Sequence, residues 1–180
     1  LYVAGKTANE VCVTGLSVEM LSNPVGLSTS NPRLSWKLES NLRDVRQTDY
    51  RILVASSINN LDKGIGDIWD SGIVESDQSL YIPYGGKSLE SGARYYWKVR
   101  VSTNNGICSW TKPAFWQMAL LSSTEWKAQW IGGTFPSDNI NIEHTQVLAR
   151  YLRKEFDLGG KIMKATLYVS GLGLYQAYLN

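Results

Sequence analysis

Apolar and polar residues alternate with a period of two along several stretches of this sequence. The stretch Tyr95–Ser102 shows the pattern most clearly, because Tyr95, Trp97, Val99 and Val101 alternate with Tyr96, Lys98, Arg100 and Ser102. Successive side chains of a β-strand point to opposite faces, so this period indicates a strand with one buried and one exposed face. The stretches Arg33–Glu39 and Thr48–Ser56 show the same alternation.

Seven such strands are predicted in the first two thirds of the chain, separated by Gly, Pro, Asn and Asp residues that favour turns. They are Val11–Glu19, Arg33–Glu39, Thr48–Ser56, Ile68–Val74, Ser79–Ile82, Tyr95–Ser102 and Ala114–Leu120. The best helix candidate is a short polar turn at Asn60–Gly64. This pattern is typical of an immunoglobulin or fibronectin type III β-sandwich. The predicted fold class is therefore all-β, with the sandwich occupying residues 1–121.

Two features inside the predicted sandwich identify core positions. Tyr95 begins the penultimate strand and follows Leu89 across a turn containing Gly92, which is the arrangement of a tyrosine corner. Trp36 and Trp97 lie in the apolar phase of their strands. We therefore predict that Trp36, Leu89, Tyr95 and Trp97 belong to the core.

The pattern changes after Leu121. Residues 122–133 are predicted to form a linker, and residues 134–180 the first strands of a second, jelly-roll-like β-domain. Its strands are expected at Leu148–Leu158, Ile162–Ser170 and Leu174–Leu179. Three strands do not easily form a stable sheet alone. We therefore expect this domain to be incomplete, and either disorder after about residue 134 or strand exchange between copies, because unpaired strand edges promote association.

Composition and charge argue against several functions. The net charge is +2 and the basic residues form no run, which disfavours nucleic-acid binding. No stretch approaches the ~20 apolar residues of a membrane-spanning helix. One His and two Cys provide no metal-ligand set, and no cofactor motif is present. Cys12 and Cys108 are expected at the same end of the sandwich, where a disulfide between them is one alternative.

Aromatic residues supply the candidate binding positions, since the chain holds seven Trp and ten Tyr against three Phe. Tyr96, Trp110 and Trp116 are candidates for contact with a glycan, and packing is the alternative for the two Trp residues. Trp126 and Trp130, four residues apart in the linker, are expected to pack against a neighbouring domain. Asp67 and Asp70 could form a carboxylate pair, but solvated turn residues are the favoured interpretation.

An ordered series of motifs resembles the N-terminal region of bacterial α-L-rhamnosidases of glycoside hydrolase family 78. The motifs are Asn31–Trp36, Gln47–Ser56, Ile68–Gly72, Gly92–Val101 and Trp126–Gly132, and Leu152–Phe156 and Ala165–Gly173 resemble the start of the next domain in those enzymes. The resemblance implies inverting hydrolysis of terminal α-L-rhamnose by a downstream (α/α)₆ barrel. It therefore implies no catalytic residue within these 180 residues, and a periplasmic, extracellular or cell-surface location.

Three functions follow from this sequence. The first is a non-catalytic accessory module that supports a downstream catalytic barrel, with possible contact to rhamnose-containing glycans. The second is a stand-alone carbohydrate-binding module, which the aromatic content favours. The third is a protein-interaction or adhesion sandwich of a surface protein, because this fold supports many functions.

Overall fold

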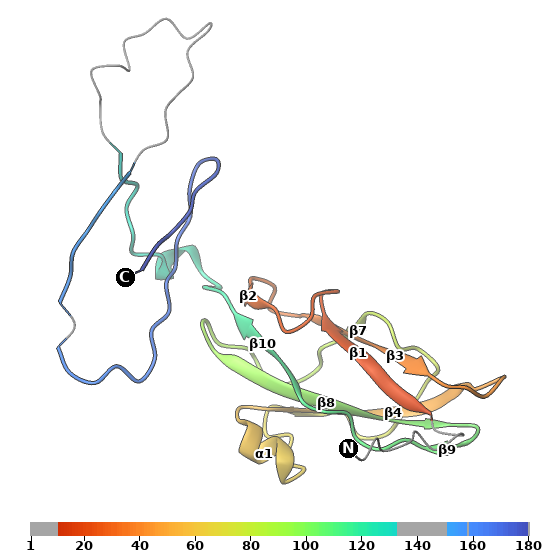
Figure 1. Cartoon of the computed structure of the whole chain (residues 1–180). Helices are drawn as coiled ribbons and strands as arrows, with labels where there is room; N and C mark the ends of the chain where they lie inside the picture. Colours follow the sequence, from red (N-terminus) through yellow and green to blue (C-terminus); the bar gives the residue numbers. More distant parts are fainter. Residues whose placement is uncertain (1–10, 133–150, 158, 180) are drawn as a thin grey trace, which may run out of the picture. The chain divides into compact units, whose positions relative to one another are not determined.

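The structure is a computed structural model that describes residues 11–132, 151–157 and 159–179 (Figure 1). The chain divides into two units, Leu1–Trp130 and Ile131–Asn180. The division falls inside the predicted linker 122–133. Nearly all regular structure of the described residues lies in the first unit.

The first unit is a β-sandwich of two sheets. The smaller sheet has the order β1 (Cys12–Val18), β3 (Arg33–Glu39) and β7 (Ile82–Pro83), all antiparallel. The larger sheet has the order β2 (Val25–Leu27), β10 (Ala114–Met118), β8 (Arg94–Thr103), β4 (Gln47–Ala55) and β5 (Trp69–Asp70). In addition, β6 (Val74–Glu75) pairs with β4, and β9 (Gly106–Ile107) pairs with β8. The pair β2–β10 is parallel.

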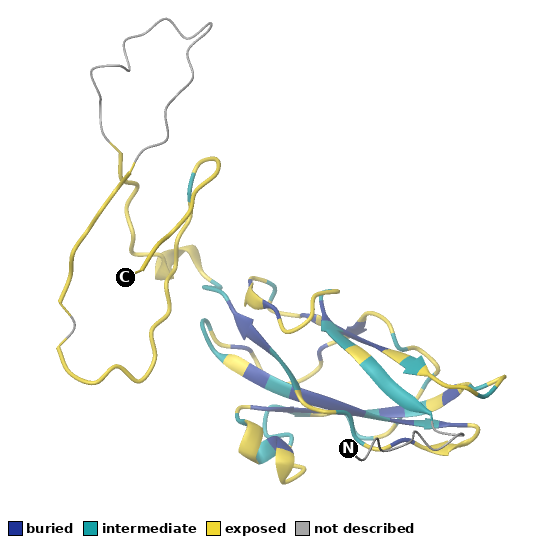
Figure 2. Cartoon of the chain, in the orientation of Figure 1, coloured by how far each residue is buried: buried dark blue, intermediate teal, exposed yellow. Residues whose placement is uncertain are grey.

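The core lies between the two sheets and draws on both. Val18, Leu34 and Trp36 come from the smaller sheet, and Ile52, Val54, Trp97, Val99, Val101, Trp116 and Met118 come from the larger one. All are at most 1% exposed. Figure 2 shows this burial along β8, β4 and β10. Removal of this apolar surface from water is the main stabilising contribution to the sandwich.

The tyrosine corner is present. The backbone N–H of Glu90 donates to the hydroxyl of Tyr95 over 2.9 Å, and Leu89 is buried beside it. Trp36, Leu89, Tyr95 and Trp97 all belong to the core cluster. The fold class predicted from the sequence, an immunoglobulin-like β-sandwich, is confirmed.

Some element boundaries differ from the prediction. The predicted strand Ile68–Val74 is two short strands, because the chain turns at Ser71 and Gly72, and Gly72 has a φ of +63°. β2 and β9 are not predicted, since two or three residues give no detectable alternation. The helix α1 spans Ile58–Asp62 and begins after Ser57, whose side chain accepts a hydrogen bond from Asn60 N.

The outer face of the larger sheet is partly covered, which the alternation does not predict. Helix α1 packs on β4 and β8, so Leu61, Leu53 and Ala55 form a second small core. Lys98 is consequently buried rather than exposed, and its ammonium donates to the carbonyl oxygen of Leu61 over 2.6 Å. That hydrogen bond satisfies a carbonyl at the helix C-terminus.

In the second unit, residues 151–157 and 159–179 form no strand, although strands are predicted there. Apolar side chains in these ranges are exposed, Leu174 and Tyr151 among them. A strand with an apolar face is stabilised by a paired neighbour and by a second layer over that face. Neither is present among the described residues of this unit. The remaining part of the predicted strand Leu148–Leu158 lies outside the described residues.

Candidate functional site

The acidic residues considered as a carboxylate pair have other partners. Asp70 makes a bidentate ion pair with Arg51, at 2.9 and 2.6 Å, and this hydrogen bonding lowers the pKa of Asp70. The carboxylate of Asp67 accepts from the backbone and hydroxyl of Ser56, at 3.1 and 2.6 Å. Both residues therefore act as structural connectors between β4 and the segment around β5.

The described residues contain neither a cluster of metal ligands nor a disulfide. Across residues 11–132, 151–157 and 159–179, no group of three or more His, Cys, Asp or Glu side chains is placed to hold a metal ion. Cys12 and Cys108 are free thiols, so the disulfide alternative is not formed in this structure. Burial, and then the neighbouring Cys12, raise the pKa of the Cys108 thiol.

Trp116 cannot contact a glycan, which corrects the sequence-based prediction. Its side chain is 0% exposed and lies in the core, with its ring centroid 5.5 Å from that of Tyr95 and 6.1 Å from that of Tyr84. The reason is the face of β10 on which Trp116 lies. Trp116 lies opposite Tyr95 in the β8–β10 ladder, so both residues face inward.

Tyr96 and Trp110 lie on the outer face of the larger sheet, but neighbouring side chains already contact their rings. Lys98 Nζ and Arg100 Cζ lie 5.1 and 5.2 Å from the ring centroid of Trp110. The Tyr96 ring lies 6.4 Å from Phe115, and both Tyr96 and Trp110 pack on the small core under α1. Cation–π contacts of this kind stabilise the sheet face. Tyr96 and Trp110 are each only partly exposed, so little of either ring is open to a sugar.

The two linker tryptophans present more surface. Trp126 follows a one-turn 3₁₀ helix, η1 (Ser123–Glu125), and is 40% exposed, whereas Trp130 is 72% exposed. The turn is closed by a capping box between Ser122 and Glu125 and is tied to Ser91 by a 2.6 Å hydrogen bond. The start of the linker is therefore fixed to the tyrosine-corner loop of the sandwich.

The most unusual surface residue is Tyr81, which lies just before β7. Its φ is +56°, a left-handed conformation that a bulky residue rarely adopts and that costs about 1–3 kcal/mol. The pairing of β3 with the segment that leads into β7 explains this conformation. Trp36 N donates to Ser79 O, whereas Leu34 pairs with Ile82. Two steps along β3 therefore face three steps along the partner segment, which defines a β-bulge at Leu80–Tyr81.

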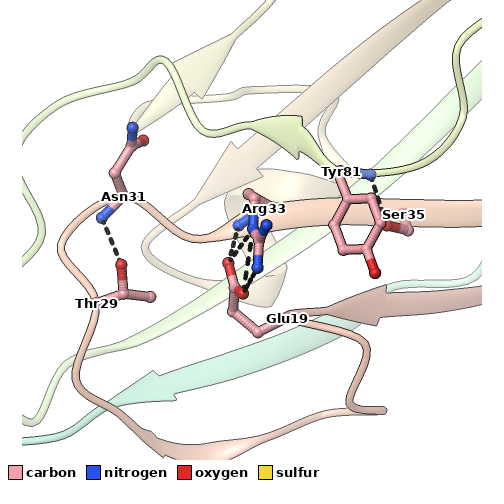
Figure 3. Close-up of polar contacts among 6 residues, drawn as sticks. All are labelled: Glu19, Thr29, Asn31, Arg33, Ser35 and Tyr81. Atoms are coloured by element: carbon pink, nitrogen blue, oxygen red, sulfur yellow. Dashed lines mark hydrogen bonds and ion pairs between the residues drawn. The ribbon is translucent and has the colours of Figure 1, made fainter.

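This bulge turns the Tyr81 ring toward Arg33. The guanidinium carbon of Arg33 lies 4.7 Å from the ring centroid, and Tyr81 N donates to the hydroxyl of buried Ser35 over 2.9 Å. Tyr81 as a whole remains 45% exposed. Figure 3 shows Arg33 between Tyr81 and Glu19, with Thr29 and Asn31 nearby on the preceding loop.

Glu19 fixes the other side of Arg33. Its carboxylate accepts from Arg33 Nη2 at 2.6 Å, from Nε at 3.1 and 3.2 Å, and from the Arg33 backbone N at 2.7 Å. The Arg33 hydrogen bonds hold the pKa of Glu19 below its usual value. Glu19 and Met20 both have positive φ and form a tight turn closed by Val18 and Leu21, the sign pattern of a type I′ turn.

Together, Glu19, Arg33, Ser35 and Tyr81 form a preorganised surface, which we call the Tyr81 cluster. It combines an exposed aromatic ring with a neutralised ion pair. Strand alternation does not reveal it, because the bulge shifts the phase of one residue and the ion pair joins residues 14 apart. The turn signal at Asn31-Pro32 and the Pro at 83 mark only the neighbouring loop and edge strand.

The fold defines an immunoglobulin-like β-sandwich module. The polar side chains described above either form hydrogen bonds between its elements or lie at its surface. The chain belongs to the family described as Rha78A-like, N-terminal immunoglobulin domain, whose model matches residues 13–122. The match covers all the strands of the sandwich except the first residue of β1.

Individual relatives support the same family assignment. An α-L-rhamnosidase of Formosa agariphila is 35% identical over 177 residues, which covers 88% of this chain. An α-L-rhamnosidase of Streptomyces avermitilis is 35% identical over 184 residues, which covers 93%. The solved structure of the Streptomyces avermitilis α-L-rhamnosidase complexed with L-rhamnose matches with a TM-score of 0.66 and 40% identity, covering 69% of this chain and 12% of that chain. This chain spans only 18% of the length of the curated relatives.

Proposed function

We propose that this chain is the N-terminal, non-catalytic module of an α-L-rhamnosidase-like glycoside hydrolase, and that it supports a downstream catalytic part. The observation that carries the proposal is the family match over residues 13–122, combined with the 18% share of the relatives' length. Inverting hydrolysis requires two carboxyl groups about 6.5–9.5 Å apart across a cleft. Asp67 and Asp70 instead bind Ser56 and Arg51, which is consistent with a non-catalytic module.

Support of a downstream part needs a surface that contacts it. Trp126 and Trp130 are the proposed anchors, because both are exposed and follow directly after the sandwich. Domain interfaces within a chain bury about 600–1,500 Å², and large aromatic side chains contribute strongly to such areas. The capping box at Ser122 and Glu125 supports this role, since it fixes the direction in which the linker leaves.

A contact with rhamnose-containing glycans is the second proposed role. Trp116 is excluded by its burial, and Tyr96 and Trp110 are only partly exposed. A glycan contact therefore requires a different aromatic surface of the sandwich. A stand-alone adhesion function has no observation in its favour.

Strand exchange is the proposed behaviour of the isolated 180-residue chain. The apolar side chains exposed in residues 151–157 and 159–179 support it, because such segments gain burial when paired. Size-exclusion chromatography with light scattering should show concentration-dependent dimers. A monomer at all concentrations would contradict strand exchange without affecting the family assignment.

The proposed location is the periplasm or the cell exterior, by analogy with enzymes that act on glycans outside the cytoplasm. Within the described residues, no helix is long and apolar enough to cross a membrane. Fractionation of cells that express the full-length protein, followed by immunodetection, tests this location directly.

The non-catalytic role is tested with a chromogenic α-L-rhamnoside. The 180-residue chain should give no turnover above buffer, while the longer protein that contains it should hydrolyse the substrate. Turnover by the 180-residue chain would contradict the proposal. Turnover by neither protein would contradict the rhamnosidase assignment of the parent.

A further inference from the structure

We infer that the Tyr81 cluster is a binding site for a neutral pyranose, with the Tyr81 ring as the stacking platform. The first supporting feature is the backbone conformation of Tyr81. A bulge near a sheet edge re-aims a side chain, and residues in sparsely populated conformations cluster at ligand contacts. Tyr81 combines both features, since it lies in the bulge with a φ of +56°, and the residue is 45% exposed.

The platform is held rigidly before any ligand arrives. Ser35, which is buried, accepts from Tyr81 N over 2.9 Å, and Ile82 and Pro83 directly after it pair with β3. Arg33 lies against the ring at 4.7 Å and is itself fixed by the Glu19 carboxylate. Preorganisation of this kind lowers the conformational entropy that a ligand must remove.

The charges of the Tyr81 cluster favour a neutral ligand over an anionic one. Arg33 is the cation of this cluster, and the bidentate contact with Glu19 neutralises it. An anionic ligand would therefore meet no net positive charge, whereas a neutral ligand loses nothing. In the described part of the chain, Arg33 Nη1 makes no hydrogen bond to protein, so its N–H groups remain available to a hydroxyl.

A pyranose fits this combination of groups. It presents an apolar C–H face that can cover an aromatic ring, and hydroxyl groups at its rim. Those hydroxyls can accept from Arg33 Nη1 and donate to the Glu19 carboxylate, whose pKa is lowered so that it stays an acceptor. The choice of a rhamnoside among pyranoses rests on the proposed function, and the sugar site itself rests on the geometry.

The test is a titration of the ¹⁵N-labelled 180-residue chain with methyl α-L-rhamnoside, followed by backbone amide shifts. Saturable shifts are expected at Tyr81, Ile82 and Arg33, with millimolar affinity, because a ligand of about a dozen heavy atoms offers little binding energy. Tyr81→Gly should abolish saturation while preserving the spectrum elsewhere, since glycine accepts the left-handed conformation. Tyr81→Phe keeps the ring and should change the affinity by less than about threefold.

Tyr96→Ala is the matched control, because it removes an aromatic ring from the other sheet and should leave the Tyr81 shifts unchanged. Absence of saturable shifts at Tyr81, or their persistence in Tyr81→Gly, would overturn the inference. Methyl glucoside distinguishes a general sugar site from a rhamnose-specific one. Equal saturation by glucoside and rhamnoside keeps the sugar site but removes the specificity taken from the proposed function.

Discussion

At the scale of single residues, one buried side chain joins the two sheets. Gln47 on β4 is 6% exposed, and its carbonyl oxygen accepts from the indole N–H of Trp36 on β3 over 3.0 Å. Its amide nitrogen donates to the backbone carbonyls of Ser76 and Gln78, at 2.9 and 2.8 Å. All three of these hydrogen bonds cross between elements, so Gln47 fixes their relative positions.

Replacing Gln47 with Leu should therefore be costly. The substitution leaves the buried Trp36 N–H and two carbonyl groups without a partner, and we expect a loss of about 3 kcal/mol in the free energy of unfolding. Urea denaturation followed by tryptophan fluorescence measures it. Gln78→Ala is the control, since it removes an exposed amide and should change stability by less than about 0.5 kcal/mol. Similar values for the two variants would contradict this role of Gln47.

Tyr84 gives the sandwich a pH dependence in the alkaline range. Burial, and then the neighbouring Tyr95, raise the pKa of Tyr84 to about 12. Its hydroxyl donates to Lys87 O over 2.6 Å, which requires the protonated form. Because the folded state holds this proton more tightly than the unfolded chain, the stabilisation is complete below pH 10 and is lost as the pH rises toward 12.

The expected result is a fall in the free energy of unfolding between about pH 10 and pH 12 that is shallower in Tyr84→Phe. Urea titrations at several pH values measure both slopes. Tyr96→Phe serves as the reference, because it removes a phenol hydroxyl from the outer face of the sheet and not from the core. An identical slope in wild type and Tyr84→Phe would show that other groups cause the alkaline loss.

At the scale of elements, the loop after β7 packs very closely on the segment before β5. A Cβ added at Gly86 would lie 2.4 Å from Tyr84 Oη, 2.5 Å from Trp69 Cβ and 2.7 Å from Ile68 O. The Trp69 and Tyr84 rings pack edge to face next to it, with centroids 5.4 Å apart. Only glycine permits this approach, which closes one side of the core.

Gly86→Ala should lower the free energy of unfolding by about 2–3 kcal/mol, because backbone and ring atoms must move to admit the methyl group. Differential scanning calorimetry should show a lower melting temperature. Gly132→Ala is the matched control, since an added Cβ there meets no atom within 4 Å. An unchanged melting temperature for Gly86→Ala would mean that the loop can shift freely.

The long strands could be predicted from the sequence, and the short ones could not. Residue types alternate along β3 and over Tyr95–Ser102 of β8, so the direction of each side chain follows from this period. β2 and β9 depend on pairing with β10 and β8, which is tertiary information. Lys98 shows the same limit, because its burial depends on helix α1 crossing the outer face.

The candidate site was less predictable than the fold. Aromatic content makes Trp116 a candidate for glycan contact, but its pairing with Tyr95 places it in the core. The sequence alone does not indicate Tyr81, because its exposure depends on a bulge that changes the phase by one residue. A backbone irregularity of this kind leaves no signature in residue type when a tyrosine occupies the position usually taken by glycine.

At the scale of the whole molecule, the sandwich and the linker differ in how far their apolar residues are buried. The two sheets of the sandwich share one core of buried residues. Trp126 and Trp130, which follow the sandwich, are 40% and 72% exposed. We therefore expect the module to act through contact with the rest of a longer protein rather than through chemistry of its own.

Deletion of residues 1–132, which removes the sandwich together with Trp126 and Trp130, from the full-length protein tests this account most directly. The account predicts that kcat/KM for a chromogenic α-L-rhamnoside changes by less than about tenfold, because no catalytic group is removed. It also predicts a melting temperature lower by several degrees, because the anchoring surface is lost. Loss of turnover in a deletion variant whose melting temperature is unchanged would contradict the account, since it would place part of the catalytic machinery within this module.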